Sequence, residues 1–359
     1  MGTEREQSAR YSAPMQIIYS DRHRVHRGEF EVYRGELVPC FEKPERADFV
    51  LEAVTERRIG SVIEPRRHGL APLERVHAQR YLRFLERAWR EWSALGQTRD
   101  MLPAVWPIRG FRDDVEPANV VAQLGLYSFD SGTPFMAGTW EAACLGADIA
   151  LTAQALVQGG ERAAFALSRP PGHHAGADFL GGYCFINNAA VAAQAFVDAG
   201  AARVAVLDVD YHHGNGTQSI FYERADVLFQ SIHGDPRTEY PFYLGHADET
   251  GRGAGLGYNR NYPLPAGSSN ELWFEALGAA CHRIHEHRPA ALVVSLGVDT
   301  FADDPISTFQ LRAPEYQRLG RELAALGLPT VFILEGGYAV AEIGDNVAEV
   351  LAAFDAVTA

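Results

Sequence analysis

The stretch Leu207-Asp208-Val209-Asp210-Tyr211-His212-His213-Gly214-Asn215-Gly216 indicates both the fold class and the kind of site to look for. The residues before it, Arg203-Val204-Ala205-Val206, form an apolar run typical of a buried strand, and the Gly and Asn residues end that strand. Asp208, Asp210 and His212 recur at every second position, so strand alternation predicts that all three side chains leave one face. Carboxylates and an imidazole projected together suit Zn²⁺ or a related borderline cation. Taken alone, the stretch could also be a solvated loop whose Asp residues cap the next helix.

Strands and helices alternate along the chain, most regularly in its second half. Continuous runs of Val, Ile and Leu predict buried strands, and the amphipathic segments between them predict helices. This alternation is typical of an α/β domain with a mostly parallel, multi-stranded sheet flanked by helices on both faces. The predicted strands cover 16–20, 163–168, 203–208, 226–232, 290–296 and 330–334, and the predicted helices cover 44–57, 72–92, 140–157, 187–199, 271–287, 314–326 and 341–354.

The domain organisation is expected to be simple. Residues 1–14 are polar and are expected to form a disordered tail, and residues 15–359 are expected to form a single domain. Between about residues 93 and 134 the hydrophobic periodicity fades among several Pro and Gly residues. This pattern predicts an irregular insertion of functional importance.

Composition limits the class of partner and the compartment. The net charge of −14 argues against a nucleic-acid partner, and no apolar run is long enough to cross a membrane. The polar start of the chain lacks the apolar core of a signal peptide. The four cysteines, Cys40, Cys144, Cys184 and Cys281, form no CxxC pair, so we expect a reducing, cytoplasmic location.

Polar or Gly-rich clusters follow five of the predicted strands. In a parallel α/β sheet the ligand site lies just beyond the carboxyl ends of the strands, so these clusters are expected to meet. The clusters are Arg169-Pro-Pro-Gly-His-His-Ala-Gly176, Asp210 with His212, His233-Gly-Asp-Pro236, Gly297-Val-Asp-Thr300 and Glu335-Gly-Gly-Tyr338.

A three-ligand metal site can be assembled from these strand ends. Asp210, His212 and Asp299 would leave coordination positions for water and substrate, as metal-assisted hydrolysis requires. Asp299 by itself could instead cap a helix.

The remaining clusters supply acid–base and electrostatic groups. His173 and His174 offer proton transfer near neutral pH. Asp208, a carboxylate, favours the imidazolium form of a partner, whereas Asn215, an amide, favours the neutral form. Tyr338 could donate its hydroxyl to a developing oxyanion. Considered singly, an adjacent His pair is often a surface feature and a Gly-Gly-Tyr stretch is often a simple turn.

The ordered set of motifs resembles the arginase–deacetylase superfamily, on its histone deacetylase side, and is most similar to the bacterial acetylpolyamine amidohydrolases. The resemblance implies the arginase–deacetylase fold and hydrolysis of small N-acetylated amines: acetylputrescine, acetylcadaverine or acetylspermidine. The motifs are Arg169-Pro-Pro-Gly-His-His-Ala, Gly182-Tyr-Cys-Phe-Ile-Asn-Asn, Leu207-Asp-Val-Asp-Tyr-His-His-Gly-Asn-Gly, Ser295-Leu-Gly-Val-Asp-Thr and Glu335-Gly-Gly-Tyr, supported by Gly35-Glu-Leu-Val-Pro, Lys43-Pro-Glu-Arg-Ala, Gly138-Thr-Trp-Glu-Ala-Ala and Asp304-Pro-Ile-Ser.

The resemblance also implies roles for individual residues. It implies Zn²⁺, or alternatively Fe²⁺, on the three ligands named above. His174 would be the general base that then protonates the leaving amine, His173 paired to Asp208 would act electrostatically, and Tyr338 would polarise the amide carbonyl. The implied substrate-binding residues are Tyr183, Tyr240, Gly182, Gly337 and the rim residue Asp130, and a structural K⁺ would contact Asp208, Asp210, His212, Ser231 and Ile232.

The insertion carries the one departure from the resemblance. In the polyamine enzymes such an insertion joins two subunits at the channel mouth, so we expect a homodimer. It also carries glutamates that receive the distal ammonium of the substrate, and here those positions align with Val121 and Gly132. Glu116 and Asp130 lie close in sequence as candidate replacements.

Three alternatives to a polyamine deacetylase are open from the sequence, and the second of them belongs to another functional class. The first is an amidohydrolase for acetyl-lysine in proteins, or for a xenobiotic or secondary-metabolite amide. The second is a catalytically silent binding protein, which would lack a ligand or the tyrosine. The third is a dimanganese arginase-type hydrolase, which would need further carboxylate ligands in place of the His-His pair.

Overall fold

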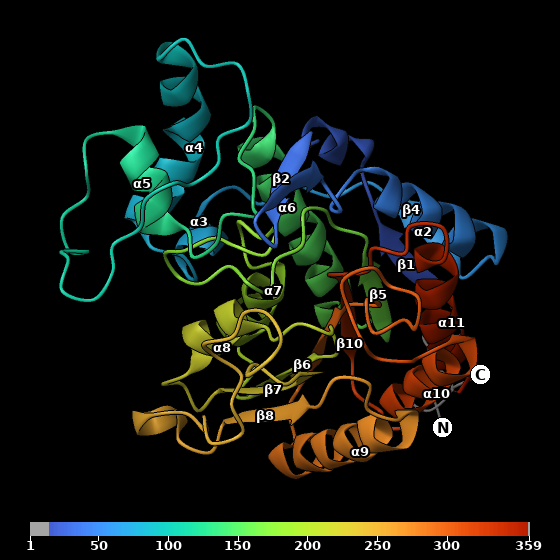
Figure 1. Cartoon of the computed structure of the whole chain (residues 1–359). Helices are drawn as coiled ribbons and strands as arrows, with labels where there is room; N and C mark the ends of the chain where they lie inside the picture. The colour runs from blue at the N-terminus through green and yellow to red at the C-terminus, as the bar shows by residue number, and fades with distance from the viewer. Residues whose placement is uncertain (1–13, 358–359) are drawn as a thin grey trace.

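An eight-stranded parallel sheet forms the centre of the molecule (Figure 1). The structure is a computed structural model that describes residues 14–357, so the predicted tail lies outside the described residues except for Pro14. The strand order is β4-β1-β5-β10-β9-β6-β7-β8. The strands are β1 (Met15–Ile18), β4 (Gly60–Ile63), β5 (Ala163–Ala166), β6 (Val204–Asp208), β7 (Val227–Gly234), β8 (Asn259–Leu264), β9 (Leu292–Leu296) and β10 (Thr330–Leu334).

Helices cover both faces of the sheet and bury a core on each side. Alternate strand residues, such as Val206 and Leu207, belong to the two different cores. Helices α2, α9, α10 and α11 pack on one face, and α4, α6 and α7 pack on the other. The helices are α2 (Glu45–Glu56), α3 (Ala71–Glu74), α4 (Gln79–Ala94), α5 (Val120–Tyr127), α6 (Thr139–Gln158), α7 (Asn188–Asp198), α8 (Asn215–Phe221), α9 (Asn270–His287), α10 (Ala313–Ala324) and α11 (Ile343–Ala356), with 3₁₀ turns η1 (Asp21–Val25) and η2 (Gly253–Gly255).

The predicted fold class is confirmed, but four of the strands in the described residues were not predicted. The edge strands β4 and β8 were not predicted, because β4 is only four residues long and β8 is rich in Asn and Arg. A small antiparallel hairpin, β2 (Phe30–Tyr33) with β3 (Glu36–Pro39), was also not predicted. Every strand pair of the large sheet is parallel, so the predicted sheet type is correct.

The long helix predicted over residues 72–92 is wrong at its start, because the helix is interrupted between α3 and α4. Ala78 adopts an extended conformation, and its N–H donates to the carbonyl of Ala177 at 2.7 Å. The neighbouring His77 is buried, and its Nδ1 lies 2.8 Å from the carbonyl oxygen of Gly176. Through these contacts, residues 77–78 between the two helices pack against the loop that follows the His173–His174 pair.

The insertion is less irregular than the sequence predicts. Residues 102–119 contain no helix or strand, but α5 follows directly and was not predicted. Asn119 caps α5 by accepting the N–H of Val121 at 2.8 Å. The helix is apolar and short, so it lacks the periodicity that would have identified it, and it packs against α4. Among the described residues, no helix has the length and apolar character needed to span a bilayer.

Strand order explains where a site can form. The four strands β5, β10, β9 and β6 are consecutive neighbours in the middle of the sheet. Because they are parallel, their carboxyl ends lie along one edge, and the loops that follow them lie side by side. Four of the five clusters predicted to meet occupy the loops after these strands, and the fifth, which begins at His233, lies at the end of the neighbouring β7.

Candidate active site

Asp210, His212 and Asp299 converge at this edge as a set of possible metal ligands. One donor atom from each lies within 4.8 Å of the others. The Nδ1 atom of His212 is 2.9 Å from Asp299 Oδ2 and 3.4 Å from Asp210 Oδ1. Both carboxylates are fully buried, whereas the His212 side chain is 11% exposed, so the set opens toward solvent on the histidine side.

The reason for this convergence differs from the one that the sequence predicts. Strand β6 ends at Asp208, so Asp210 and His212 do not lie on a strand. Two successive turns place them instead: Asp210 N–H donates to Asp208 Oδ1 at 3.1 Å, and His212 N–H donates to Asp210 Oδ1 at 2.9 Å. As a result, Asp210 and His212 converge while the other carboxylate oxygen of Asp208 is directed to His173.

The charges of this set fit a divalent cation. Burial raises the pKa of Asp299 to about 7, and the nearby Asp210 carboxylate adds to the increase. Burial opposes a charged His212, but Asp210 and Asp299 outweigh it and raise the pKa of His212 to about 10. Two buried carboxylates beside an imidazole therefore favour a positive charge between them, and one nitrogen with two oxygens is a ligand set that suits Zn²⁺.

Gly336 allows the loop after β10 to approach these carboxylates closely. Its N–H donates to Asp210 Oδ2 at 2.7 Å. A Cβ atom at this position would lie only 2.5 Å from Asp210 Oδ2 and 2.6 Å from Asp299 Oδ2. Any side chain here would therefore displace the two carboxylates.

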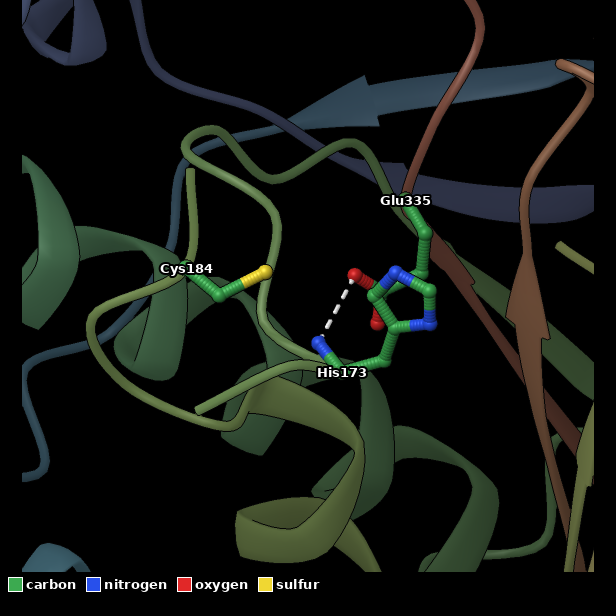
Figure 2. A group of neighbouring side chains, drawn as sticks. All are labelled: His173, Cys184 and Glu335. Carbon is green, nitrogen blue, oxygen red and sulfur yellow. Dashed lines mark hydrogen bonds between the residues drawn. The ribbon is translucent and has the colours of Figure 1, made fainter. Parts of the chain in front are cut away.

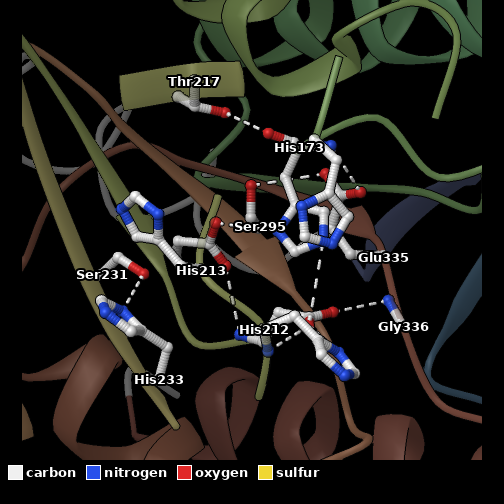
Figure 3. A network of polar contacts seen from close by, with 12 residues as sticks. His173, His212, His213, Thr217, Ser231, His233, Ser295, Glu335 and Gly336 are labelled. Carbon is white, nitrogen blue, oxygen red and sulfur yellow. Dashed lines mark hydrogen bonds and ion pairs between the residues drawn. The ribbon is translucent and has the colours of Figure 1, made fainter. Parts of the chain in front are cut away.

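The two adjacent histidines have chemically different partners. His173 Nδ1 lies 3.0 Å from Asp208 Oδ2, and His174 Nδ1 lies 2.6 Å from Asn215 Oδ1. The ring centroids are 4.0 Å apart, and both residues are buried. Figure 3 shows His173 within the polar network that also contains His212, Ser295 and Glu335.

These partners separate the protonation behaviour of the pair. Burial disfavours a charged His173, but the carboxylates of Asp210 and Asp208 prevail and raise its pKa to about 10. Burial, together with the nearby His173 and His212, holds the pKa of His174 well below its usual range. His174 is therefore a neutral imidazole at neutral pH, and His173 is the cation of the pair.

Tyr338 is fixed through both its ring and its backbone. Asp304 Oδ2 accepts the N–H of Tyr338 at 2.7 Å, and the Arg46 guanidinium lies 4.8 Å from the centroid of the Tyr338 ring. Arg46 Nε also donates to the carbonyl of Gly337 at 2.7 Å. Burial raises the pKa of the Tyr338 phenol well above its usual range, so the hydroxyl keeps its proton and can donate it in a hydrogen bond.

Tyr183 and Tyr240 each donate a phenol hydroxyl to a carboxylate. The hydroxyl of Tyr240 donates to Asp130 Oδ2 at 2.6 Å, and that of Tyr183 donates to Glu31 Oε1 at 2.7 Å. The Tyr240 ring packs edge-on against His174, with centroids 5.2 Å apart. The Tyr183 ring packs in the same way against Tyr338 at 5.6 Å. The two aromatic rings therefore lie beside the groups that would perform the chemistry.

Gly182 and Asp130 link these walls to the histidines. The N–H of Gly182 donates to Asp130 Oδ2 at 2.6 Å. Gly182 has a φ of +54°, and a Cβ atom there would lie 2.1 Å from His174 Cδ2, so only glycine fits. Asp130 thus accepts hydrogen bonds from both Gly182 and Tyr240, which places its carboxyl group beside the aromatic ring of Tyr240.

Three of the five residues predicted to contact K⁺, Asp208, Ser231 and Ile232, lie on the neighbouring strands β6 and β7, and Asp210 and His212 lie in the turn after β6. Asp208 on β6 pairs in register with Ser231 on β7, and Ile232 follows it; all three are buried. The Ser231 hydroxyl is already engaged with His233, whose Nδ1 lies 2.8 Å away (Figure 3). His233 itself is buried beside the site and also contacts the carbonyl of Gly245 at 2.8 Å.

Of the insertion residues considered as acceptors for a substrate ammonium, only Asp130 lies at the site. Glu116 is paired with Arg87 at 2.5 Å, so its charge is compensated locally. Val121 is on α5 and packs against the core, and Gly132 lies beside the backbone of Val32. Of the four residues Glu116, Val121, Asp130 and Gly132, Asp130 accepts a hydrogen bond from the Tyr240 hydroxyl.

Sequence reasoning assigned no role to a buried ion network behind Tyr338. Arg169 donates to Glu42 at 2.5 and 2.8 Å, and Glu42 also accepts from Arg46 at 3.0 Å. Both arginines are fully buried. The available signal was their position: Arg169 opens the His-His motif, and Arg46 stands in a stretch that contributed to the family resemblance.

Comparisons with known proteins show what the whole chain is similar to. The model of the histone deacetylase domain matches residues 40–354. A Pseudomonas aeruginosa protein named acetylpolyamine amidohydrolase 2 is 57% identical over 343 residues, covering 96% of this chain and 99% of the relative. A Mycoplana ramosa acetylpolyamine amidohydrolase is 50% identical over 337 residues, covering 94% of this chain and 98% of the relative. The crystal structure of an acetylpolyamine aminohydrolase from Burkholderia pseudomallei superposes with a TM-score of 0.91 at 42% identity, covering 96% of this chain and 99% of that one.

Proposed function

Since this chain belongs to the histone deacetylase domain family, we propose that it hydrolyses the amide bond of small N-acetylated amines, with acetylpolyamines as its substrates. The chain is accordingly a hydrolytic deacetylase. The observation that carries the proposal is the pairing of a three-donor metal set with two histidines of opposite protonation behaviour. Acetate and the free amine would be the products.

The metal would be held by Asp210, His212 and Asp299. When bound, a divalent cation would polarise the amide carbonyl and make water more acidic. Zn²⁺ is the first choice because of the mixed nitrogen and oxygen donors, and Fe²⁺ is the alternative.

The protein side chains would divide the proton transfers between them. Neutral His174 would accept a proton from the attacking water and then deliver it to the leaving amine nitrogen. His173, held as a cation by Asp208, would stabilise negative charge. Tyr338 would donate its hydroxyl to the carbonyl oxygen as that atom becomes negative.

The substrate would enter between the aromatic walls. Tyr183 and Tyr240 would flank an alkyl chain, with Gly182 and Gly337 allowing the close approach of the backbone. Asp130 lies at the wall where an ammonium group would pass. The carboxylate of Asp130 would favour a substrate with a distal ammonium group, which an acetylpolyamine carries.

Two structural features belong to the same proposal. K⁺ would be held by Asp208, Asp210, His212, Ser231 and Ile232, on the neighbouring strands β6 and β7 and the turn after β6. A homodimer would cover the exposed apolar side chains Val105, Ile108 and Phe111 of the insertion. A cytoplasmic setting is supported by the four described cysteines, which are all free.

A substrate panel tests the proposal directly. Acetylputrescine, acetylcadaverine, acetylspermidine, an acetyl-lysine peptide and an arylacetamide would be compared by kcat/KM, with and without a chelator. We expect an acetylated polyamine to be the best substrate and the chelator to abolish turnover. Preference for the peptide or the arylacetamide would overturn the substrate assignment, and turnover that resists thorough metal removal would overturn the mechanism.

A further inference from the structure

Glu335 is a fully buried carboxyl group to which the chemistry above gives no task. It follows β10 directly and opens the Glu-Gly-Gly-Tyr motif. Figure 2 shows its carboxyl group directed at the backbone nitrogen of His173, and the side chain of Cys184 points toward these two groups. Its Oε2 atom accepts the N–H of Gly172 at 2.7 Å and that of His173 at 3.1 Å.

These two bonds act on the loop that carries both histidines. An unpaired buried N–H is costly, so the carboxylate oxygen that satisfies two of them strongly favours this one loop conformation. The other oxygen, Oε1, lies 3.4 Å from the hydroxyl of Ser295 on β9. One side chain thus connects the loop after β5 with the strands β9 and β10.

The backbone of Glu335 is itself held from several directions. Its N–H donates to the carbonyl of Leu296 at 3.1 Å, and its carbonyl accepts from Arg46 at 2.5 Å. The next residue, Gly336, donates to Asp210. The position of the histidine loop is therefore tied to the metal-ligand Asp210 and to the turn that ends in Tyr338.

A second metal site is the competing interpretation of this group. Donor atoms of His173, Cys184 and Glu335 lie within 4.8 Å of one another. However, the Glu335 carboxylate already accepts two backbone N–H groups, and the Cys184 thiol donates to the carbonyl of Gly182 at 3.3 Å. Burial also raises the pKa of Cys184 well above its usual range, whereas a thiolate is the form that binds metals.

We propose that Glu335 is a positioning residue that fixes the His173–His174 loop relative to Tyr338 and the metal ligands. The inference rests on the proposed deacetylase function. It gives a task to the first residue of the Glu-Gly-Gly-Tyr motif, which acts through the backbone of its neighbours and does not touch the substrate.

The test uses two variants of Glu335 in the full chain. Glu335→Gln keeps an oxygen that can accept both N–H groups, whereas Glu335→Ala leaves both unpaired. We expect kcat of Glu335→Ala to fall roughly 100-fold, the scale of a displacement of about 1 Å in a catalytic group, with KM nearly unchanged. Glu335→Gln should recover most of that loss, and both variants should hold as much metal as the wild type.

Asp148 provides a control away from the site, although it is less deeply buried than Glu335. It is a carboxyl group on α6 whose Oδ1 accepts one backbone N–H, that of His68, at 2.7 Å. Burial raises the pKa of Asp148, as it raises that of Glu335 to about 7. Asp148→Ala and Asp148→Asn should leave kcat close to the wild-type value. An equal loss of kcat in Asp148→Ala would show that the effect is general destabilisation and would overturn the proposal.

A measurement without turnover separates this inference from the proposed function. The imidazole NMR resonances of His173 and His174 should shift in Glu335→Ala, return toward wild type in Glu335→Gln and stay unchanged in Asp148→Ala. Unchanged resonances in Glu335→Ala, or two metal ions per wild-type chain of which one is lost in Glu335→Gln, would overturn the positioning role. A wild-type chain inactive on the whole panel would instead overturn the deacetylase assignment, and the NMR comparison would still decide the role of Glu335.

Discussion

The edge of the sheet that carries the proposed metal ligands and residues 102–119, the part of the insertion without helix or strand, are opposite in construction. At the sheet edge the polar groups are buried and paired, as His173 with Asp208 and His174 with Asn215. In the insertion, which Figure 1 shows extending away from the body, Val105 and Ile108 are 64% and 65% exposed. In the proposed function, buried and paired groups of the sheet edge would perform the reaction, whereas the exposed apolar residues of this segment would form the dimer contact.

The largest effect is expected at the sheet edge, from Asp299→Ala. Removing this ligand should eliminate most of the bound metal and lower kcat by about 10³-fold or more, since several kcal/mol of transition-state stabilisation depend on the metal. Metal analysis of the purified variant, alongside kcat, checks this. Full metal occupancy in the variant would show that Asp299 is not a ligand.

Tyr338→Phe should produce the next largest effect. Loss of one donor to a developing oxyanion lowers kcat by about 10²–10³-fold. The metal should stay bound, because the phenol hydroxyl is not one of the proposed ligands. Steady-state kinetics with metal analysis would detect this, and turnover near the wild-type rate would remove Tyr338 from the mechanism.

Asn215→Asp should change pH dependence more than rate. A carboxylate in place of the amide favours the imidazolium and raises the pKa of His174, which burial now holds low. His174 must be neutral to accept a proton, so activity is lost as pH falls through its pKa. The acid limb of the kcat/KM profile should therefore move to higher pH, with Asn215→Gln as the uncharged control. An unmoved limb would argue that a different group is the base.

The smallest effect on chemistry is expected from Ile108→Asp in the insertion. A charge on this exposed apolar residue should disrupt the proposed dimer, which analytical ultracentrifugation would reveal as a shift to monomer. We expect kcat on acetylputrescine to stay close to the wild-type value while KM rises. A wild-type chain that is already monomeric, or a variant with greatly reduced kcat, would remove the distinction between the two regions.

The same division explains what could be predicted from the sequence. The strands that deliver the site are continuous apolar runs, and their motifs are short, so β6, β9 and β10 and the residues after them were located from local patterns. The sheet edges and α5 were missed, because short or polar elements carry little periodicity. The reason for the Asp210–His212 convergence was also missed, since a turn and a strand can share a spacing of two.

Contacts between distant parts of the chain were beyond sequence reasoning. Arg46 reaches Gly337 across 291 positions, and Tyr183 reaches Glu31 across 152. Neither pair follows from a local pattern, because each depends on how the hairpin and α2 pack against the finished sheet. The residues that touch the substrate in the proposal were thus easier to identify than those that hold them.

The central place of β10 has a consequence for how the protein is made. β10 is the last strand along the chain, yet it inserts between β5 and β9, with the Glu335–Tyr338 turn at its end. Because β10 separates them, β5 and β9 gain this neighbour only after residues 330–334 have been synthesised, so we expect their inner edges to stay unpaired until then. We therefore expect activity to appear only when β10 completes the sheet, and we expect a chain truncated before β10 to expose two unpaired strand edges and to aggregate.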